Sequence, residues 1–150
     1  MELSEKYKIE LINLHKAVSS FEAALMATFE NLDSIGQDLI KNGRIQKFEY
    51  CAELAWKTGK MHLELFEGIL ANSPKGVYKS LFQSAIITEN EYLSLYKTIE
   101  DRNLLSHVYK EEMFESVYKN ISAHLLAFKW LLRKLDKSPN LGSFKIKSLP

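Results

Sequence analysis

The segment from Asp101 to Tyr109 holds the residues of this sequence that are best suited to chemistry. It contains Arg102, Asn103 and His107. A guanidinium can bind a phosphate through two parallel hydrogen bonds and can stabilise negative charge as it develops. An imidazole exchanges protons near neutral pH, and the Asn103 amide can add a neutral hydrogen bond. Together these side chains suit phosphodiester chemistry, and cleavage through a ribose 2′-hydroxyl would need no metal.

The spacing of Arg102 and His107 sets a condition on this chemistry. On an unbroken α-helix, five residues turn the chain by about 500°, which leaves the two side chains about 140° apart around the axis. They therefore meet only if the backbone bends between them. We expect such a bend, because the apolar stripe of the following helix restarts near Phe114. Taken alone, His107 is more typical of a structural histidine, and Arg102 of a cation at a helix end.

Three charged residues earlier in the chain, Glu49, Glu53 and Lys57, follow one another at intervals of four. On a helix this spacing predicts an exposed ladder of ion pairs, each contributing a few tenths of a kcal/mol. A second interpretation is that these residues orient the Arg102–His107 site. The spacing leaves both interpretations open.

Composition narrows the classes of protein to consider. The chain has 150 residues, of which 46% are hydrophobic and 26% charged, as in one globular domain. The net charge is +1, and the last fourteen residues carry three Lys and no acid, which leaves −2 for residues 1–136. Such a body does not attract nucleic acid in general, so any RNA binding must come from a local site. Three further histidines lack partners at the spacing of metal ligands, which predicts no metal site: His15, His62 and His124.

The sequence also predicts a cytoplasmic location without membrane contact. The single cysteine, Cys51, permits no internal disulfide and suits a reducing compartment. The N-terminus is mixed in charge from its second residue, so we expect no signal peptide. The most apolar stretch, His124–Leu132, is interrupted by Lys129 and is too short to cross a bilayer.

Apolar periodicity predicts the helices that must position these side chains. Nine positions of the first segment recur at alternating intervals of four and three, on one stripe of a long helix: Tyr7, Leu11, Leu14, Val18, Phe21, Leu25, Thr28, Leu32 and Ile35. We expect a break at Asn42-Gly43, with an earlier turn near Gly36 as the alternative. Because the stripe is longer than a small bundle needs, we expect part of it to meet a second copy of the chain.

Four further helices are expected, over about Arg44–Leu70, Pro74–Ala85, from Thr88 to the region of Arg102, and over Lys110–Leu135. Ser73-Pro74 and the pair Thr88 and Glu91 match signals of helix starts. Gly59, inside the second helix, allows another helix to approach closely. No long stretch alternates with a period of two, so no strands are expected. We therefore predict an all-α fold, an up-and-down antiparallel bundle of four to five helices over residues 1–136 that forms a homodimer, with a flexible tail over 137–150.

Several blocks of this sequence together resemble one protein family. They are IQKFEY (45–50), ELAWK (53–57), SPK (73–75) and RNLLSHVY (102–109), in this order. An Arg-x4-His pair occurs by chance in many proteins, but this ordered combination resembles the nucleotidyltransferase substrate-binding branch of the HEPN superfamily. The resemblance spans about residues 44–125.

The resemblance implies a helical homodimer whose motif lines a cleft between the subunits. Many members of the superfamily are the toxin of a two-component toxin–antitoxin pair and cut RNA without a metal. The antitoxin is a small nucleotidyltransferase, which can inactivate the toxin by adding AMP groups to the tyrosine of the motif. By position, Arg102 and His107 would be catalytic, Asn103 would support them, and Tyr109 would be the modification acceptor.

Three functions fit these observations. The first is a metal-independent endoribonuclease that acts as a homodimer, needs no cofactor and is neutralised by a minimal nucleotidyltransferase. The alternative is a non-catalytic subunit that holds substrate for a separate nucleotidyltransferase, since this chain has neither a glycine-rich nucleotidyltransferase loop nor a paired Asp motif. The third is a degenerate relative that only dimerises.

Overall fold

The computed structural model describes residues 1–107 and 111–136, and all regular structure in these ranges is helical. The elements are α1 (Leu3–Met26), α2 (Ser34–His62), a π-helical turn η1 (Leu63–Glu67), α3 (Pro74–Gln83), α4 (Glu89–His107), α5 (Glu111–Tyr118) and α6 (Ile121–Asp136). The all-α prediction is confirmed for this part of the chain. It holds six α-helices rather than four to five, because a turn at residues 119–120 divides the expected last helix into α5 and α6.

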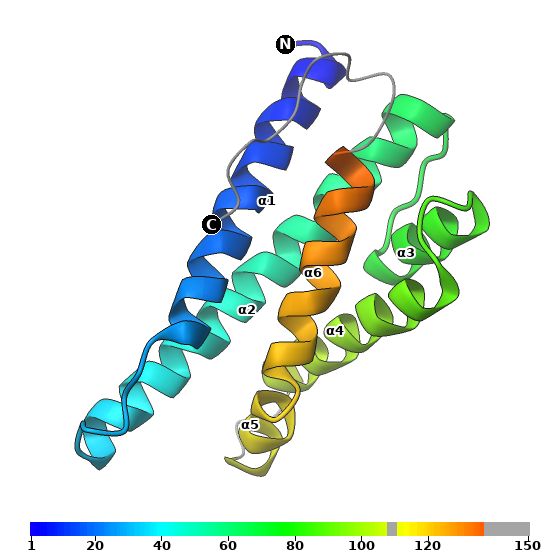
Figure 1. Cartoon of the computed structure of the whole chain (residues 1–150). Coiled ribbons are helices and arrows are strands. Elements are labelled where there is room, and N and C mark those ends of the chain that lie inside the picture. Colours follow the sequence, from blue (N-terminus) through cyan, green and yellow to red (C-terminus); the bar gives the residue numbers. More distant parts are fainter. Residues whose placement is uncertain (108–110, 137–150) are drawn as a thin grey trace.

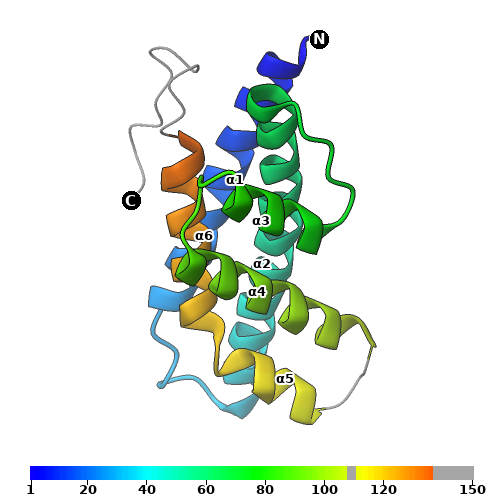
Figure 2. The ribbon, with the colours of Figure 1, turned by 90° about the vertical axis from the view of Figure 1, so that its right-hand side faces the viewer.

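The long helices α1, α2 and α6 lie side by side, and α3 and α4 pack on one flank of this group (Figure 1). α1 runs antiparallel to α2, and α4 runs antiparallel to α6 (Figure 1). In the view turned by 90°, α4 crosses α2 obliquely and α5 lies below it (Figure 2). The middle of α2 is therefore flanked by α1 on one side and by the helix that carries the motif on the other.

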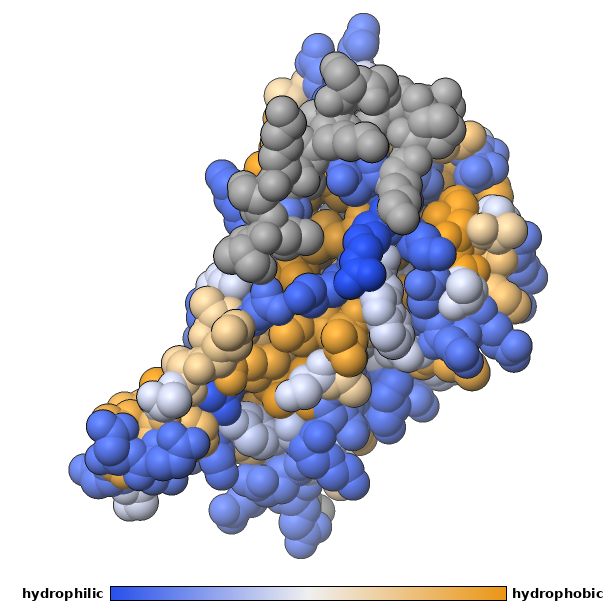
Figure 3. Space-filling model, viewed as in Figure 1, coloured by the Kyte–Doolittle hydropathy of each residue, from blue (hydrophilic) through white to orange (hydrophobic). Residues whose placement is uncertain are grey.

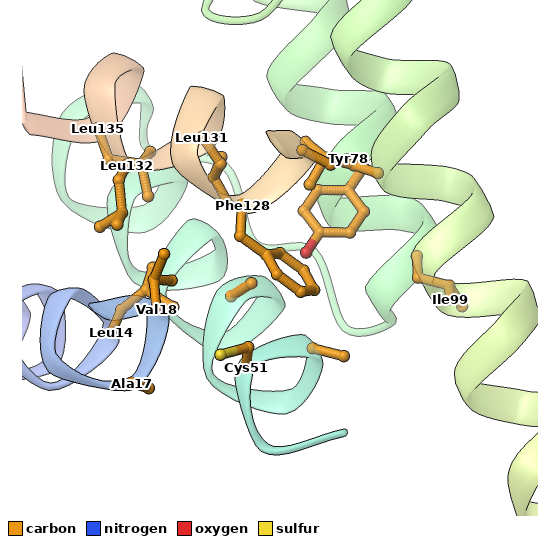
Figure 4. Packing of buried hydrophobic residues seen from close by; sticks show 14 of the residues in the cluster. Leu14, Ala17, Val18, Cys51, Tyr78, Ile99, Phe128, Leu131, Leu132 and Leu135 are labelled. Carbon is orange, nitrogen blue, oxygen red and sulfur yellow. The ribbon is translucent and has the colours of Figure 1, made fainter. Parts of the chain in front are cut away.

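The core is built from the inward stripes of five helices. Figure 4 shows side chains of α1, α2, α3, α4 and α6 meeting there, among them Leu14, Cys51, Tyr78, Ile99 and Phe128. The stripe of α1 is fully buried from Tyr7 to Phe21. In the space-filling view, apolar residues remain visible between α1 and α6 while polar residues surround them (Figure 3).

α1 ends earlier than its sequence stripe predicts, and the side chain of Arg44 explains why. The last carbonyl groups of a helix lack partners within the helix and need donors from elsewhere. The buried guanidinium of Arg44, from α2, donates to the carbonyl oxygens of Ala24 at 2.9 Å, Ala27 at 2.8 Å and Leu25 at 3.3 Å. A residue far along the chain thus terminates α1.

The prediction that one helix carries all nine positions of the stripe is therefore wrong. Thr28, Leu32 and Ile35 lie beyond the end of α1, and Leu32 and Ile35 are 41% and 71% exposed. α2 begins just after Asp33, whose carboxylate accepts the backbone N–H of Gly36 at 2.7 Å. Because the buried stripe is shorter than expected, its length no longer argues for a second copy of the chain.

The predicted break at Asn42-Gly43 is also wrong, because α2 continues through both residues. A Cβ atom on Gly43 would meet nothing within 4 Å, so neither packing nor conformation requires a glycine there. At Gly59, by contrast, a Cβ atom would lie 3.0 Å from Val77 and 3.3 Å from Leu81. This confirms the expected close approach of another helix, which is α3.

The predicted helix starts at Ser73 and Thr88 are confirmed. The Ser73 hydroxyl accepts the backbone N–H of Gly76 at 3.1 Å, and α3 begins at Pro74. The Thr88 hydroxyl accepts the N–H of Glu91 at 3.2 Å, and the Glu91 carboxylate accepts the N–H of Thr88 at 2.8 Å. This reciprocal pair forms a capping box at the start of α4.

Candidate functional site

A pocket of about 180 Å³ lies between α2, α4 and the start of α3, and we call it the motif pocket. It is lined by Ala52, Glu53, Trp56, Pro74, Ile99, Arg102, Asn103 and Ser106. Residues from three of the sequence blocks that resemble the HEPN superfamily thus share one cavity. Two of the predicted site residues, Arg102 and Asn103, lie side by side on its wall.

The guanidinium of Arg102 is held on one side and open on another. Its Nη1 atom donates to the hydroxyl of Ser106 at 2.6 Å and lies 3.4 Å from the carboxylate of Glu49. The side chains of Arg102 and Glu49 are each about one-third exposed, at 33% and 34%. The Nε–H group of Arg102 is buried and has no acceptor among the described residues. The exposed part of the Arg102 side chain is what a phosphate oxygen entering the pocket can reach.

Two residues of the charged ladder on α2, Glu49 and Glu53, lie against the Arg102 motif or its pocket. Glu49 contacts Arg102, while Glu53 lines the pocket and pairs with Lys57 at 2.9 Å. Burial alone would raise the pKa of Glu53, but hydrogen bonds from Lys57 and Trp56 outweigh it. Together with the charges of Lys57 and Arg102 they lower this pKa. The ladder is therefore both an ion-pair network and a wall of the site; its role in orienting the motif stays a prediction.

The expected bend between Arg102 and His107 is wrong, because α4 is helical through both residues. A regular helix separates the directions of their side chains by about 140°. The chain leaves the helix only after His107. The side chain of His107 and the whole of Tyr109 lie outside the described residues, so their predicted roles stay predictions.

A buried polar group that the sequence did not predict lies directly beneath the motif, and we call it the Asp101 cluster. It consists of Phe48, Asp101, Asn120 and His124. Asp101 and His124 are only 1% and 2% exposed, and His124 Nε2 lies 2.6 Å from the Asp101 carboxylate. Asn120 donates to the same carboxylate oxygen at 3.1 Å, and the ring of His124 stacks on Phe48 at 4.6 Å between centroids.

The carboxylate of Asp101 is kept ionised by its partners. Burial alone would raise its pKa, but hydrogen bonds from His124 and Asn120 outweigh burial. The charge of Lys97, whose Nζ atom lies 3.5 Å away, acts in the same direction, and the pKa falls below its usual range. One signal in the sequence could have revealed this group, because Asp101 continues the buried spacing of Leu95 and Thr98 on α4.

No group of three or more His, Cys, Asp and Glu side chains within 1–107 and 111–136 is arranged to hold a metal ion. In the same ranges, no helix has the length and apolar character needed to cross a membrane.

Comparison with known proteins gives one family and several similar structures. The family model described as "Nucleotidyltransferase substrate binding protein like" matches residues 9–137. A protein of Haemophilus influenzae named probable ribonuclease HepT is 31% identical over an alignment of 111 residues, which covers 71% of this chain and 75% of the relative.

Two solved structures share the fold at lower sequence identity. A protein of Thermus thermophilus superposes with a TM-score of 0.71 at 22% identity, covering 83% of this chain and 99% of its own. A tri-AMPylated Shewanella oneidensis HEPN toxin in complex with an MNT antitoxin has a TM-score of 0.66 at 16% identity, covering 92% and 99%.

Proposed function

Because this chain belongs to the nucleotidyltransferase substrate-binding protein-like family, a HEPN branch, we propose that it is a metal-independent endoribonuclease toxin that acts as a homodimer. The observation that carries the proposal is the state of Arg102. Its guanidinium is anchored by Glu49 and Ser106 on the wall of an open pocket, and its side chain stays one-third exposed there, at 33%. The name of the Haemophilus influenzae relative supports RNA as the substrate.

In the proposed reaction, His107 takes the proton of a ribose 2′-hydroxyl while the 2′-oxygen attacks the adjacent phosphorus. The bond from phosphorus to the 5′-oxygen breaks, and that oxygen receives a proton from the imidazolium of His107, which leaves a 2′,3′-cyclic phosphate and a 5′-hydroxyl. Arg102 neutralises the charge that develops on the phosphoryl oxygens. Asn103 adds a hydrogen bond from the same wall of the pocket. The proposed location is the cytoplasm, because the single free cysteine, Cys51, suits a reducing compartment.

The geometry of α4 supports a site shared between two copies. Positions five residues apart on a regular helix face directions about 140° apart, so a site that uses positions 102 and 107 of α4 is more readily completed by a second copy than by one protomer. In the proposed homodimer, each copy contributes both residues to a common cleft. An open hollow of about 740 Å³ adjoins the motif pocket through Trp56 and is lined partly by apolar Ile9, Leu54 and Met61. This apolar surface supports burial against a second copy.

The proposed partner is a small nucleotidyltransferase antitoxin that adds AMP to Tyr109. The modification would place phosphate charge and a bulky nucleoside two residues from His107. Tyr109→Phe should then remain active when the antitoxin and ATP are present, while the wild-type protein is silenced. Tyr50→Phe, which changes an exposed tyrosine on α2, is the matched control and should be silenced like the wild type.

The family description also favours a second function, in which the chain holds substrate for a separate nucleotidyltransferase and cuts nothing. In that case the motif pocket would bind a phosphate of the substrate without a proton transfer at His107. A stable complex with the nucleotidyltransferase, in the absence of any RNA cleavage, would favour this function over the first.

One experiment separates the two functions. The purified protein is incubated with single-stranded RNA in the presence of EDTA, and the products are resolved on a denaturing gel. We expect cleavage by the wild type and by Arg133→Gln, which removes an exposed arginine elsewhere on the bundle, and none by Arg102→Gln or His107→Ala. Absence of cleavage by the wild type, or equal cleavage by His107→Ala, contradicts the ribonuclease proposal.

A further inference from the structure

We infer that Asp101 and His124 are positioning residues, which hold α4 against α2 and α6 so that Arg102 meets Glu49 at the rim of the motif pocket. The catalytic consequence of this inference rests on the proposed ribonuclease function. The structural part does not, because it concerns the placement of one guanidinium and can be measured without a substrate.

The imidazole of His124 joins three helices at one buried point. Its Nε2 atom bonds the carboxylate of Asp101 on α4 at 2.6 Å. Its ring lies flat on Phe48 of α2, with 18° between the ring planes. Asn120, in the turn that leads into α6, donates to the same carboxylate oxygen. The cluster therefore ties α2, α4 and α6 together with directional contacts.

Each helix that contacts His124 carries a partner of the surface ion pair at the next residue. Glu49 follows Phe48 on α2, and Arg102 follows Asp101 on α4. Successive residues of an α-helix point about 100° apart. When Phe48 and Asp101 both face the buried imidazole, Glu49 and Arg102 emerge toward solvent, where they meet at 3.4 Å. The contacts of His124 with Phe48 and Asp101 and the contact of Glu49 with Arg102 thus require the same alignment of α2 and α4.

The surface pair is too weak to set this alignment by itself. An exposed ion pair contributes little to stability, because solvent screens it and both long side chains lose rotational freedom. A buried carboxylate is different, since it tolerates only arrangements in which its donors remain in place. A turn or slip of α4 would remove His124 and Asn120 from Asp101. We therefore infer that the Asp101 cluster sets the alignment of α2 and α4. The position of Arg102 at the rim of the motif pocket follows from that alignment.

The placement of Arg102 can be followed by nuclear magnetic resonance, because the chain holds only three arginines: Arg44, Arg102 and Arg133. Protein labelled with ¹⁵N-arginine gives three Nε–Hε signals, which Arg102→Lys and Arg133→Lys assign. Glu49→Gln then shows where the Arg102 signal lies once its anionic partner is lost.

Two substitutions of His124 separate its two contacts. His124→Phe keeps a ring against Phe48 and removes the donor to Asp101, whereas His124→Gln keeps an N–H group at a similar reach. We expect His124→Phe to move the Arg102 signal toward its position in Glu49→Gln, and His124→Gln to restore most of the wild-type position. Tyr7→Phe is the matched control, because it removes a buried hydrogen bond of 2.8 Å to His62 elsewhere in the bundle. It should leave the signal unchanged.

Cleavage kinetics give the catalytic consequence. Displacement of a catalytic group by about 1 Å can cost roughly 100-fold in rate. We expect kcat to fall about 10- to 100-fold in His124→Phe, with recovery in His124→Gln and little change in KM for the RNA. In Tyr7→Phe, kcat should equal that of the wild type at a temperature where both are folded.

The two measurements fail in different ways. If the wild type cuts no RNA, the ribonuclease proposal fails, and the arginine spectra still decide the placement of Arg102. If the Arg102 signal of a folded His124→Phe variant stays at its wild-type position, the inference is overturned whatever the cleavage rate. If that variant does not fold, Asp101→Asn takes its place, and an unmoved Arg102 signal there has the same meaning.

Discussion

In the described part of this bundle, two buried histidines, His62 and His124, each form a hydrogen bond to a side chain on another helix. The two differ in the chemistry of that partner. His124 is bonded to the carboxylate of Asp101, directly beneath the proposed site. His62 is bonded at 2.8 Å to the hydroxyl of Tyr7, and the two pack with Phe66 to form what we call the Tyr7 cluster. Both imidazoles are almost fully covered, at 2% and 4% exposure.

The Tyr7 cluster closes the core with uncharged groups. Burial raises the pKa of Tyr7 above its usual range and lowers the pKa of His62 to about 4. The Tyr7 hydroxyl also lies 3.4 Å from the carbonyl oxygen of Leu135, so the cluster links α1, α2 and α6. Among the described residues, none that adjoins Tyr7 or His62 in sequence lines the motif pocket.

The Asp101 cluster holds a charge, and the residues next to it in sequence form a solvent-facing pair. The comparison teaches that a buried histidine by itself does not indicate function. A buried charge does point to function when the residue next to it in sequence lines a pocket, as Arg102 does beside Asp101. The reason is that a buried charge is costly to retain in a purely structural role. The predictions below test this difference, beginning with the largest expected effect.

Arg102→Gln should lower RNA cleavage by at least about 100-fold, because it removes the group that stabilises charge in the transition state. The melting temperature should change little, since the side chain is partly exposed and its ion pair is weak. Cleavage assays and thermal melts of the same preparation measure both. A large loss of melting temperature would show instead that Arg102 is mainly a structural residue.

Asp101→Ala should lower the free energy of unfolding by about 3–5 kcal/mol, because it leaves His124 and Asn120 without their buried partner. Urea unfolding followed by circular dichroism measures this loss. Glu100→Ala, one residue earlier on the exposed face of α4, is the control and should change stability by less than about 0.5 kcal/mol. Equal values for the two variants would remove the distinction between the buried and the exposed acid.

The two clusters should lose stability in different ranges of pH. The pKa of His62 falls from 6.5 unfolded to about 4 folded, so the unfolded chain binds more protons between these values. The contribution of His62 to the free energy of unfolding is therefore fully present above pH 6.5. It is lost as the pH falls toward 4, by an amount on the order of 3 kcal/mol. Asp101 contributes above its unfolded value of 3.8 and loses its contribution only at lower pH.

Urea unfolding at a series of pH values checks this difference. The double variant Tyr7→Phe/His62→Leu should flatten the slope between pH 6.5 and 4.5, whereas Asp101→Asn should leave that slope intact. Part of the slope should remain in the double variant. His15 supplies it, because burial lowers its pKa more than the charge of Asp136 raises it.

Tyr7→Phe gives the smallest expected effect, a loss of about 1 kcal/mol, because it removes a neutral hydrogen bond and leaves Nδ1 of His62 without its partner. RNA cleavage by this variant should match that of the wild type. A loss of cleavage here would mean that any weakening of the core disturbs the site, and the comparison of the two clusters would no longer hold.

Much of the local structure could be predicted because its causes lie within a few residues. The capping box of Thr88 and Glu91 and the start of α3 at Ser73-Pro74 follow from contacts across one helical turn. The apolar stripe from Tyr7 to Phe21 lies in the core as its spacing requires. The order of the motif blocks was enough to identify the family.

Two helix boundaries were predicted wrongly, because contacts beyond the local sequence decide where these helices end. Arg44 ends α1 by binding its last carbonyl groups, and nothing in the sequence near Met26 predicts that. The continuation of α2 through Gly43 shows that packing along a long helix can override a local helix breaker.

The sequence by itself determined that this chain is helical, where most of its helices carry their buried stripes, and to which family it belongs, because periodicity, caps and motif order are properties of neighbouring residues. Only the tertiary structure decided that Glu49 holds Arg102 and that Asp101 and His124 form a buried pair. Those contacts join α2 to α4 and α4 to α6, and their formation depends on how whole helices align. Side-chain spacing along one helix carries no information on that alignment.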